Sequence, residues 1–250
     1  MKNLLKFELR KLWQSKSLYI IFGLGLFSII LIMLLGKLVT DVFNVTPNAT
    51  VYLLSAISAG SVPSLVGIYL AIFACSDNQQ HTIKNVYARG YSRDAVFFTK
   101  YLVSLMVTFA VAILYILFAF VFALILGGRA DSMAGYMWGK LALQFWILFG
   151  LHGLYYGVSQ LTGKMVISLV INIVGIGLVF TLLNALISII TSKANIDFSI
   201  FDYNLEMMLS NLLGEDKLTT AQLVRALVVP FAYAAVFITG GWFVNRRRDV

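Results

Sequence analysis

The residues of this chain best suited to chemistry are two histidines and one cysteine. His81 lies among polar residues, whereas His152 lies in the uncharged stretch from Leu141 to Gly163, and Cys75 is the single cysteine. Membrane hydrolases and transferases need paired carboxylates, a His and Glu metal set, or a nucleophile with its base. The sequence offers none of these combinations, so we expect no catalytic residues and no metal site. We interpret His152 as a hydrogen-bonded packing residue.

Features that the sequence lacks exclude further classes of function. The chain contains no GxxxxGK[ST] motif, so we do not expect it to bind ATP by that route. Its uncharged stretches contain no Asp, Glu, Lys or Arg. Ion-coupled carriers usually keep acids inside the membrane, because coupling needs a group that changes charge. The sequence therefore disfavours a single-chain ion-coupled carrier.

The elements that must position any functional residue are predicted to be membrane helices. The chain is 60% hydrophobic and 12% charged, against about 25% charged residues in soluble proteins. Six uncharged stretches each reach the roughly 20 residues that cross a bilayer as a helix. We therefore predict an all-α polytopic membrane protein with six transmembrane helices. The expected membrane segments are residues 18–36, 56–76, 101–127, 141–162, 166–190 and 226–245, with Thr46, Pro47, Asn48 and Thr50 in a loop.

The distribution of basic residues predicts the orientation in the membrane. Thirteen of the 19 Lys and Arg residues fall in the segments that are inside if the N-terminus is cytoplasmic. This excess indicates a multi-pass protein of the cell membrane with both termini in the cytoplasm. The net charge of +8 then reflects topology and contact with anionic lipid, and it does not indicate nucleic-acid binding.

The first 16 residues are amphipathic at helical spacing. Leu5, Leu9, Leu12 and Trp13 fall at i, i+4, i+7 and i+8. Such a helix lies in the membrane interface with its apolar face in the acyl boundary. The alternative is a plain positively charged anchor for the first span, and composition alone does not separate the two.

A patterned segment, residues 77–99, separates the second and third spans. Ile83, Val86 and Tyr87 lie at i, i+3 and i+4 of a short helix that Thr82 can cap. An exposed apolar stripe on such a helix favours a partner surface. The alternative is that the stripe folds back on the chain's own spans or on lipid.

Capping signals mark the starts of two later helices. Ser92 can cap the helix that becomes the third span, with Asp94 in its first turn. Thr219 and Gln222 form a capping box before the sixth span. The long segment before that span, residues 193–225, is expected to be an extracellular cap of short helices.

Small and polar residues remain inside the spans. Gly153 and Gly157 form a small-xxx-small pair in the fourth span, which we expect to pack within one subunit. Asn172 and Asn184 in the fifth span point in directions that differ by roughly 120°. One of them can line a path while the other bonds a neighbouring helix, and the sequence leaves open which.

Taken together, these features resemble the permease subunit of an ABC-2 type transporter. The segment Thr82–Asn85, reading TIKN, and the Gly-x-Ser-Arg turn at Gly90–Arg93 are similar to the loop after the second span in that family. The basic ending Phe243–Val250 is also similar. Two residues depart from the pattern: Asp77 stands where Glu is more usual, and His81 stands where a Gly often precedes the Thr-Ile pair.

The resemblance implies a single ABC-2 transmembrane domain over residues 1–250 that works with other subunits. Two permeases, identical or different, pair with two cytoplasmic ATPase subunits that carry ATP and Mg²⁺, so the permease itself holds no cofactor. Residues 1–16 would be the elbow helix, and the helix in 77–99 would be the coupling helix that docks on the ATPase. Its contact residues would be Thr82, Ile83, Asn85, Val86, Tyr87, Arg89 and Arg93.

The same resemblance implies export of an amphipathic peptide or a lipid-like substrate between two permeases. Permeases for bacitracin, lantibiotics or phenol-soluble modulins are examples. A function of another class remains open, which is a membrane scaffold or immunity protein that sequesters a peptide without ATP-driven transport.

Overall fold

The computed structural model describes residues 2–42, 49–58, 61–79, 83–126, 134–194, 199–213 and 218–247. All regular elements in these ranges are helical, which confirms the predicted all-α class. Six helical segments are long and apolar enough to cross a membrane, as predicted.

The chain begins with a short helix, α1 (Lys2–Trp13), that turns into the first long helix, α2 (Lys16–Val42). The predicted second span falls on two helices, α3 (Ala49–Ser58) and α4 (Ser61–Gln79). Next come the short α5 (Ile83–Ala88) and the long α6 (Arg93–Ile125) and α7 (Ala134–Thr162).

The fifth span consists of α8 (Met165–Val170), the π-helix η1 (Ile171–Gly175) and α9 (Ile176–Ala194). Two short helices follow, the 3₁₀ helix η2 (Ile200–Tyr203) and α10 (Leu205–Asn211). The last helix is α11 (Thr220–Arg247).

One expected loop residue is helical. Thr50 lies in the first turn of α3 and is buried, so its assignment to a loop was wrong. The helix extends this far because α3 packs along α6 and α7, and it buries Leu54, Ala56 and Ile57 in the process. Thr46, Pro47 and Asn48 lie outside the described residues.

Both predicted helix starts have the expected capping bonds. The Ser92 hydroxyl accepts a hydrogen bond from the backbone N–H of Ala95 at 3.2 Å. The N–H of Thr219 donates to the Gln222 side chain at 2.9 Å, and the N–H of Gln222 donates to the Thr219 hydroxyl at 3.3 Å. These bonds satisfy N–H groups that a helix start leaves without partners.

The closest helix pair is α7 with α11. A Cβ atom added to Gly153 would lie 2.7 Å from the Ala234 Cα, and one added to Gly157 would lie 2.3 Å from the backbone oxygen of Phe237. The glycines therefore let the two backbones touch. They pack within one subunit, as expected from the small-xxx-small pair.

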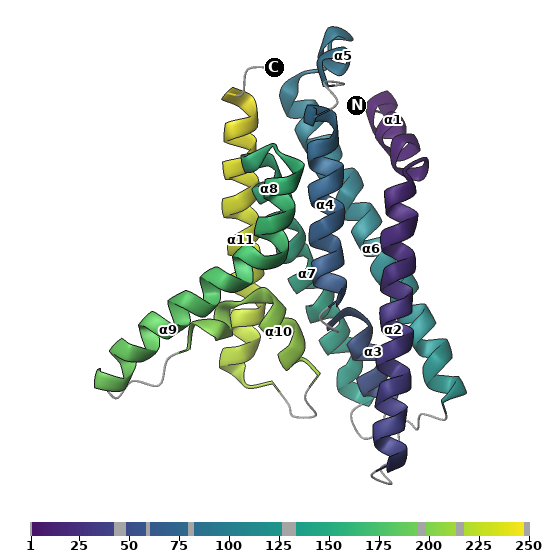
Figure 1. Ribbon diagram of the computed structural model, residues 1–250, viewed down its shortest axis with the longest axis vertical. Helices are drawn as coiled ribbons and strands as arrows, with labels where there is room; N and C mark the ends of the chain where they lie inside the picture. Colours follow the sequence, from purple (N-terminus) through teal and green to yellow (C-terminus); the bar gives the residue numbers. More distant parts are fainter. Residues whose placement is uncertain are drawn as a thin grey trace.

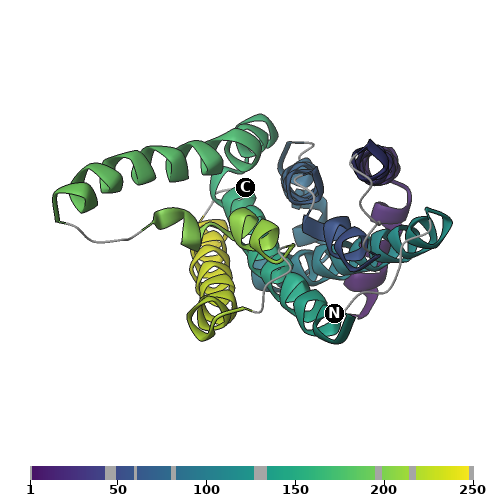
Figure 2. The same cartoon turned by 90° about the horizontal axis from the view of Figure 1, so that it is seen from below.

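The fifth span leaves the bundle part-way along its length. In Figures 1 and 2, α9 extends away from the other helices, while α8 lies beside them. The π-helix between them contains Asn172, which is buried and donates to the backbone oxygen of Gly67 at 3.1 Å and to the Ser159 hydroxyl at 3.3 Å. Asn172 thus fixes the fifth span to α4 and α7, and α9 departs beyond it.

The bundle has two distinct ends. Figure 1 places α1, α5 and both chain termini at one end, and α10 toward the other. Both ends of the chain therefore lie at the same end of the bundle. The end that carries α1 and α5 is called the terminal end below.

Candidate functional site

The short helix α5 stands at the terminal end of the bundle, apart from the packed spans (Figure 1). It ends because Gly90, which follows it, adopts a positive φ of 84°, a conformation that costs glycine little. The N–H of Gly90 closes the helix on the backbone oxygen of Tyr87 at 2.9 Å. The predicted cap, Thr82, lies outside the described residues.

The side chains of α5 are divided between the chain itself and the outside. Ile83 is 6% exposed and packs inward, so the expected stripe is not exposed as a whole. Val86 and Tyr87 are half-buried, and Asn85 and Arg89 are exposed. The surface that α5 offers is therefore polar and basic, with Val86 and Tyr87 along its edge.

Arg93 joins α5 to the last helix. Its guanidinium lies over the ring of Tyr87 at 5.8 Å, and its Nη1 donates to the backbone oxygen of Arg246 at 3.0 Å. Beside it, the indole N–H of Trp242 donates to the Asp94 carboxylate at 2.8 Å. The beginning of α6, the end of α11 and α5 are thereby connected.

A cluster of charged side chains lies beneath α5, where α1, α4 and α6 meet. The Asp77 carboxylate accepts hydrogen bonds from both the Lys11 and the Lys100 ammonium groups. Asp77 and Lys100 are each 3% exposed. Buried charges need such partners, because removal from water is costly. Asp77, Lys11 and Lys100 therefore link three helices at the base of the α5 segment.

Glu8 completes this cluster in an unusual state. It is fully buried, and both of its carboxylate oxygens lack a hydrogen-bond partner. Burial raises the pKa of Glu8 above its usual value, although nearby Lys100 acts in the opposite direction. In this cluster both lysines therefore pair with the same carboxylate, that of Asp77. Glu8, Lys11, Asp77 and Lys100 are called the charged cluster below.

One side of α1 faces the bundle. Leu4, Glu8 and Leu12 lie on this side and are buried, where α1 packs against α6. Of the expected apolar stripe, Leu12 is therefore buried and Leu5 half-buried, whereas Leu9 and Trp13 are 36% and 75% exposed. The helix has one apolar side against the protein and another left open, and its placement in the membrane interface stays a prediction.

The polar residues predicted inside the spans make internal contacts. His152 is fully buried, with Nε2 3.1 Å from the Ser104 hydroxyl and Nδ1 3.1 Å from the Thr108 hydroxyl. Asn184 lies half-buried on α9 and accepts from the Ser199 hydroxyl at 3.4 Å. The hydrogen bonds of His152, Asn172 and Asn184 described here join them to other spans and to Ser199, not to residues of α5.

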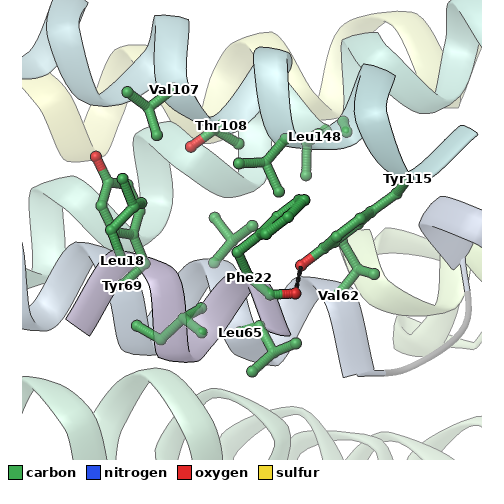
Figure 3. A pocket seen from close by; sticks show the side chains of 13 residues that line it. Leu18, Phe22, Val62, Leu65, Tyr69, Val107, Thr108, Tyr115 and Leu148 are labelled. Atoms are coloured by element: carbon green, nitrogen blue, oxygen red, sulfur yellow. Dashed lines mark hydrogen bonds between the residues drawn. The ribbon is translucent and has the colours of Figure 1, made fainter. Parts of the chain in front are cut away.

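A small apolar cavity lies between α2, α4, α6 and α7. Figure 3 shows its lining, with the Tyr115 hydroxyl donating to the backbone oxygen of Phe22 at 3.2 Å. Its volume is about 30 Å³, which is close to the space of one water molecule. We regard it as a packing defect between spans.

Sequence reasoning did not identify Glu8, Lys11 and Lys100 as parts of a site. Lys11 and Lys100 counted toward the predicted orientation in the membrane, and Glu8 had no predicted role. One local signal was present: Glu8 is the single acid before Asp41, and it lies four residues from both Leu4 and Leu12. An acid on an apolar helical face indicates a buried partner.

Comparison with known proteins gives one match. A family model described as "ABC-2 family transporter protein" matches residues 4–175. This range includes α1 from Leu4 onward, the charged cluster and α5, and it ends at the last residue of η1. No curated protein and no solved structure matches the chain.

Proposed function

This chain belongs to the ABC-2 family of transporter proteins, and we propose that it is the permease subunit of an exporter. ATP and Mg²⁺ bind to a separate ATPase chain, present in two copies. A second permease, identical or different, completes the complex. Both termini, and with them α5, face the cytoplasm of the cell.

In this proposal α5 is the coupling helix that docks on the ATPase. The observation that carries it is the position of α5, which projects from the terminal end of the bundle with Asn85 and Arg89 exposed. Thr82, Val86, Tyr87 and Arg93 contribute to the same contact. Ile83 lies behind this exposed surface, because its side chain is buried.

The contacts around α5 connect it to the spans, so a movement of α5 would be passed on to them. A force on α5 reaches α11 through Arg93, which contacts both Tyr87 and the backbone of Arg246. A force passed to α4, which precedes α5 in the chain, reaches α1 and α6 through Asp77, because Asp77 binds Lys11 and Lys100. ATP-driven closure of the ATPase pair would thus move several spans together, with α1 acting as the elbow helix.

The proposed substrate is an amphipathic peptide or a lipid-like molecule that leaves through the space between two permeases. Support comes from the six spans, whose surfaces expose many large apolar side chains. Apolar side chains on the spans of two such chains would line the path and contact such a substrate.

A co-purification experiment in mild detergent tests the coupling helix. We would compare the unchanged chain with an Asn85→Arg, Val86→Asp double variant on α5. The expected result is an ATPase with a GxxxxGK[ST] motif that co-purifies with the unchanged chain and is lost from the variant. Substrate export should be lost with it.

A matched control carries the same two kinds of substitution at the other end of the bundle. Ser210→Arg with Met207→Asp changes two exposed residues of α10, and it should keep the ATPase. Absence of any ATPase from the unchanged chain would contradict the exporter proposal. Retained protection against a peptide in that case would favour a scaffold or immunity protein.

A further inference from the structure

The two lysines and two acids of the charged cluster are unevenly paired. Lys11 binds one oxygen of the Asp77 carboxylate, and Lys100 binds the other. Glu8 is fully buried, and neither of its carboxylate oxygens has a hydrogen-bond partner. A buried carboxylate without a donor is costly once it ionises. The described arrangement therefore suits the cluster only while Glu8 carries its proton.

Lys100 is the cation best placed to become the partner of Glu8. It lowers the pKa of Glu8 more than Lys11 does, although Lys11 stands only three residues from Glu8 on the same helix. Lys100 is also almost as buried as Glu8, whereas the Lys11 side chain is 31% exposed. A lysine has a flexible stem, and its ammonium group has three donors. Lys100 can therefore bind Glu8 before it leaves Asp77.

The remaining titratable groups around Glu8 offer it no positive charge. Asp77 on α4 repels an ionised Glu8. Tyr69 on α4 and Tyr156 on α7 also interact electrostatically with Glu8, but a tyrosine is neutral well above pH 7. An ionised Glu8 in this part of the structure would thus draw on Lys100.

We propose that Lys100 exchanges between two carboxylates, Asp77 on α4 and Glu8 on α1. While Glu8 is protonated, Lys100 stays on Asp77, as in the described structure. When Glu8 ionises, Lys100 moves to it and Lys11 keeps Asp77. Each carboxylate then has one lysine, and the positive charge of the cluster is balanced.

The exchange changes which helices are joined at the terminal end. In the described arrangement, Asp77 joins α4 to both α1 and α6. In the other arrangement, α4 remains joined to α1 through Lys11, while the bond from Lys100 now joins α6 to α1. The end of α4, which precedes α5 in the chain, is thereby released from α6. This switch lies within the chain itself and requires no ATPase.

Double-mutant cycles on the purified chain in detergent test the exchange. Glu8→Gln, Lys100→Met and their combination are unfolded with denaturant at a series of pH values. The interaction between the two positions is read as a factor in the unfolding equilibrium constant. We expect a factor near one at the lowest pH and about tenfold or more at the highest, the size of a hydrogen bond to a charged group. The cycle of Asp77→Asn with Lys100→Met should change in the opposite direction.

Lys11→Met in place of Lys100→Met gives the matched control. Lys11 belongs to the same cluster but keeps Asp77 in both arrangements, so its cycle with Glu8→Gln should change little with pH. A factor that grows with pH for Lys11 and not for Lys100 would overturn the proposal. So would factors that stay near one for both lysines.

A second measurement does not depend on the fold tolerating Lys100→Met. Amide hydrogen exchange of the last turn of α4 is compared between the unchanged chain and Glu8→Gln, which keeps the protonated arrangement. At the highest pH, the unchanged chain should exchange there about tenfold faster than the variant at the same pH, and at the lowest pH equally fast. Equal exchange at every pH would overturn the proposal. Because no ATPase is present, neither result bears on the coupling role of α5.

Discussion

At the scale of single residues, two ion pairs of this chain differ in how much they contribute to the stability of the fold. Asp77 and Lys100 are almost fully buried, whereas the side chains of Asp202 and Arg225 are 47% and 37% exposed. Exposed pairs contribute little to stability, since water and salt screen them. Removal of one partner from a buried pair leaves an unpaired charge in a poorly solvated place. The two pairs therefore predict different responses to the same substitution.

Asp77→Asn should strongly destabilise the protein. Lys100 would lose its counter-ion while remaining buried, and we expect the free energy of unfolding to fall by about 3–5 kcal/mol. Denaturant unfolding in detergent micelles measures this change. The control, Asp202→Asn, should cost about 1 kcal/mol or less. Similar losses for both variants would show that the charged cluster is not a buried ion pair.

Glu8 should make stability depend on pH. The folded state raises its pKa above the usual value of 4.5, so the folded chain binds this proton more tightly than the unfolded chain does. Stability then falls as the pH rises through the folded pKa. Glu8→Gln cannot ionise, so its stability should fall less as the pH rises above the usual range of a glutamate.

Melting temperatures of the unchanged chain and the Gln variant across that pH range provide the measurement. The two curves should separate as the pH rises, with the variant higher at the upper end of that range. Parallel curves would mean that Glu8 does not titrate in this range in the folded protein.

At the scale of helices, the sequence predicts where a helix starts and how long it is better than it predicts which other helices it contacts. Ser92 starts α6 and the Thr219–Gln222 pair starts α11, because capping depends on residues three positions apart. The inward face of α1 is formed by Leu4, Glu8 and Leu12 and not by the whole predicted stripe, because α1 packs against α6, which is distant in sequence. The burial of Ile83 likewise does not follow from the stripe that it forms with Val86 and Tyr87. Local patterns predict an element, while its orientation depends on long-range contacts.

The α7–α11 contact gives a prediction at this scale. Gly157→Ala places a methyl group 2.3 Å from the Phe237 backbone oxygen, and the helices must separate. We expect a loss of about 1–3 kcal/mol, read as a lower melting temperature. Gly177→Ala is the control, since its added Cβ would meet nothing within 4 Å. It should be neutral or stabilising by up to about 1 kcal/mol, because alanine favours helix.

At the scale of the whole molecule, the two ends of the bundle should lie on opposite sides of the membrane. The terminal end carries α5, and the other end carries α10 (Figure 1). Cys75 is buried, so it gives a low background for thiol labelling of the native protein. An introduced cysteine at either end then reports the side on which that end lies.

Intact cells with a membrane-impermeant maleimide give the test. Ser210→Cys on α10 should be labelled directly, because this residue is exposed on the side predicted to be extracellular. Asn85→Cys on α5 should be labelled only after the membrane is permeabilised. The reverse pattern would invert the proposed orientation and would place α5 where no cytoplasmic ATPase can reach it.

The contact of α7 with α11 also has a consequence for how the chain is made. Gly150, Gly153 and Gly157 leave the ribosome long before Pro230, Ala234 and Phe237, which cover them in the finished protein. During synthesis the fourth span, α7, therefore enters the bilayer with its glycine face open to lipid. The fifth span must not occupy that face. The outward course of α9 keeps it clear. A chain that stops before the sixth span would keep this glycine face uncovered.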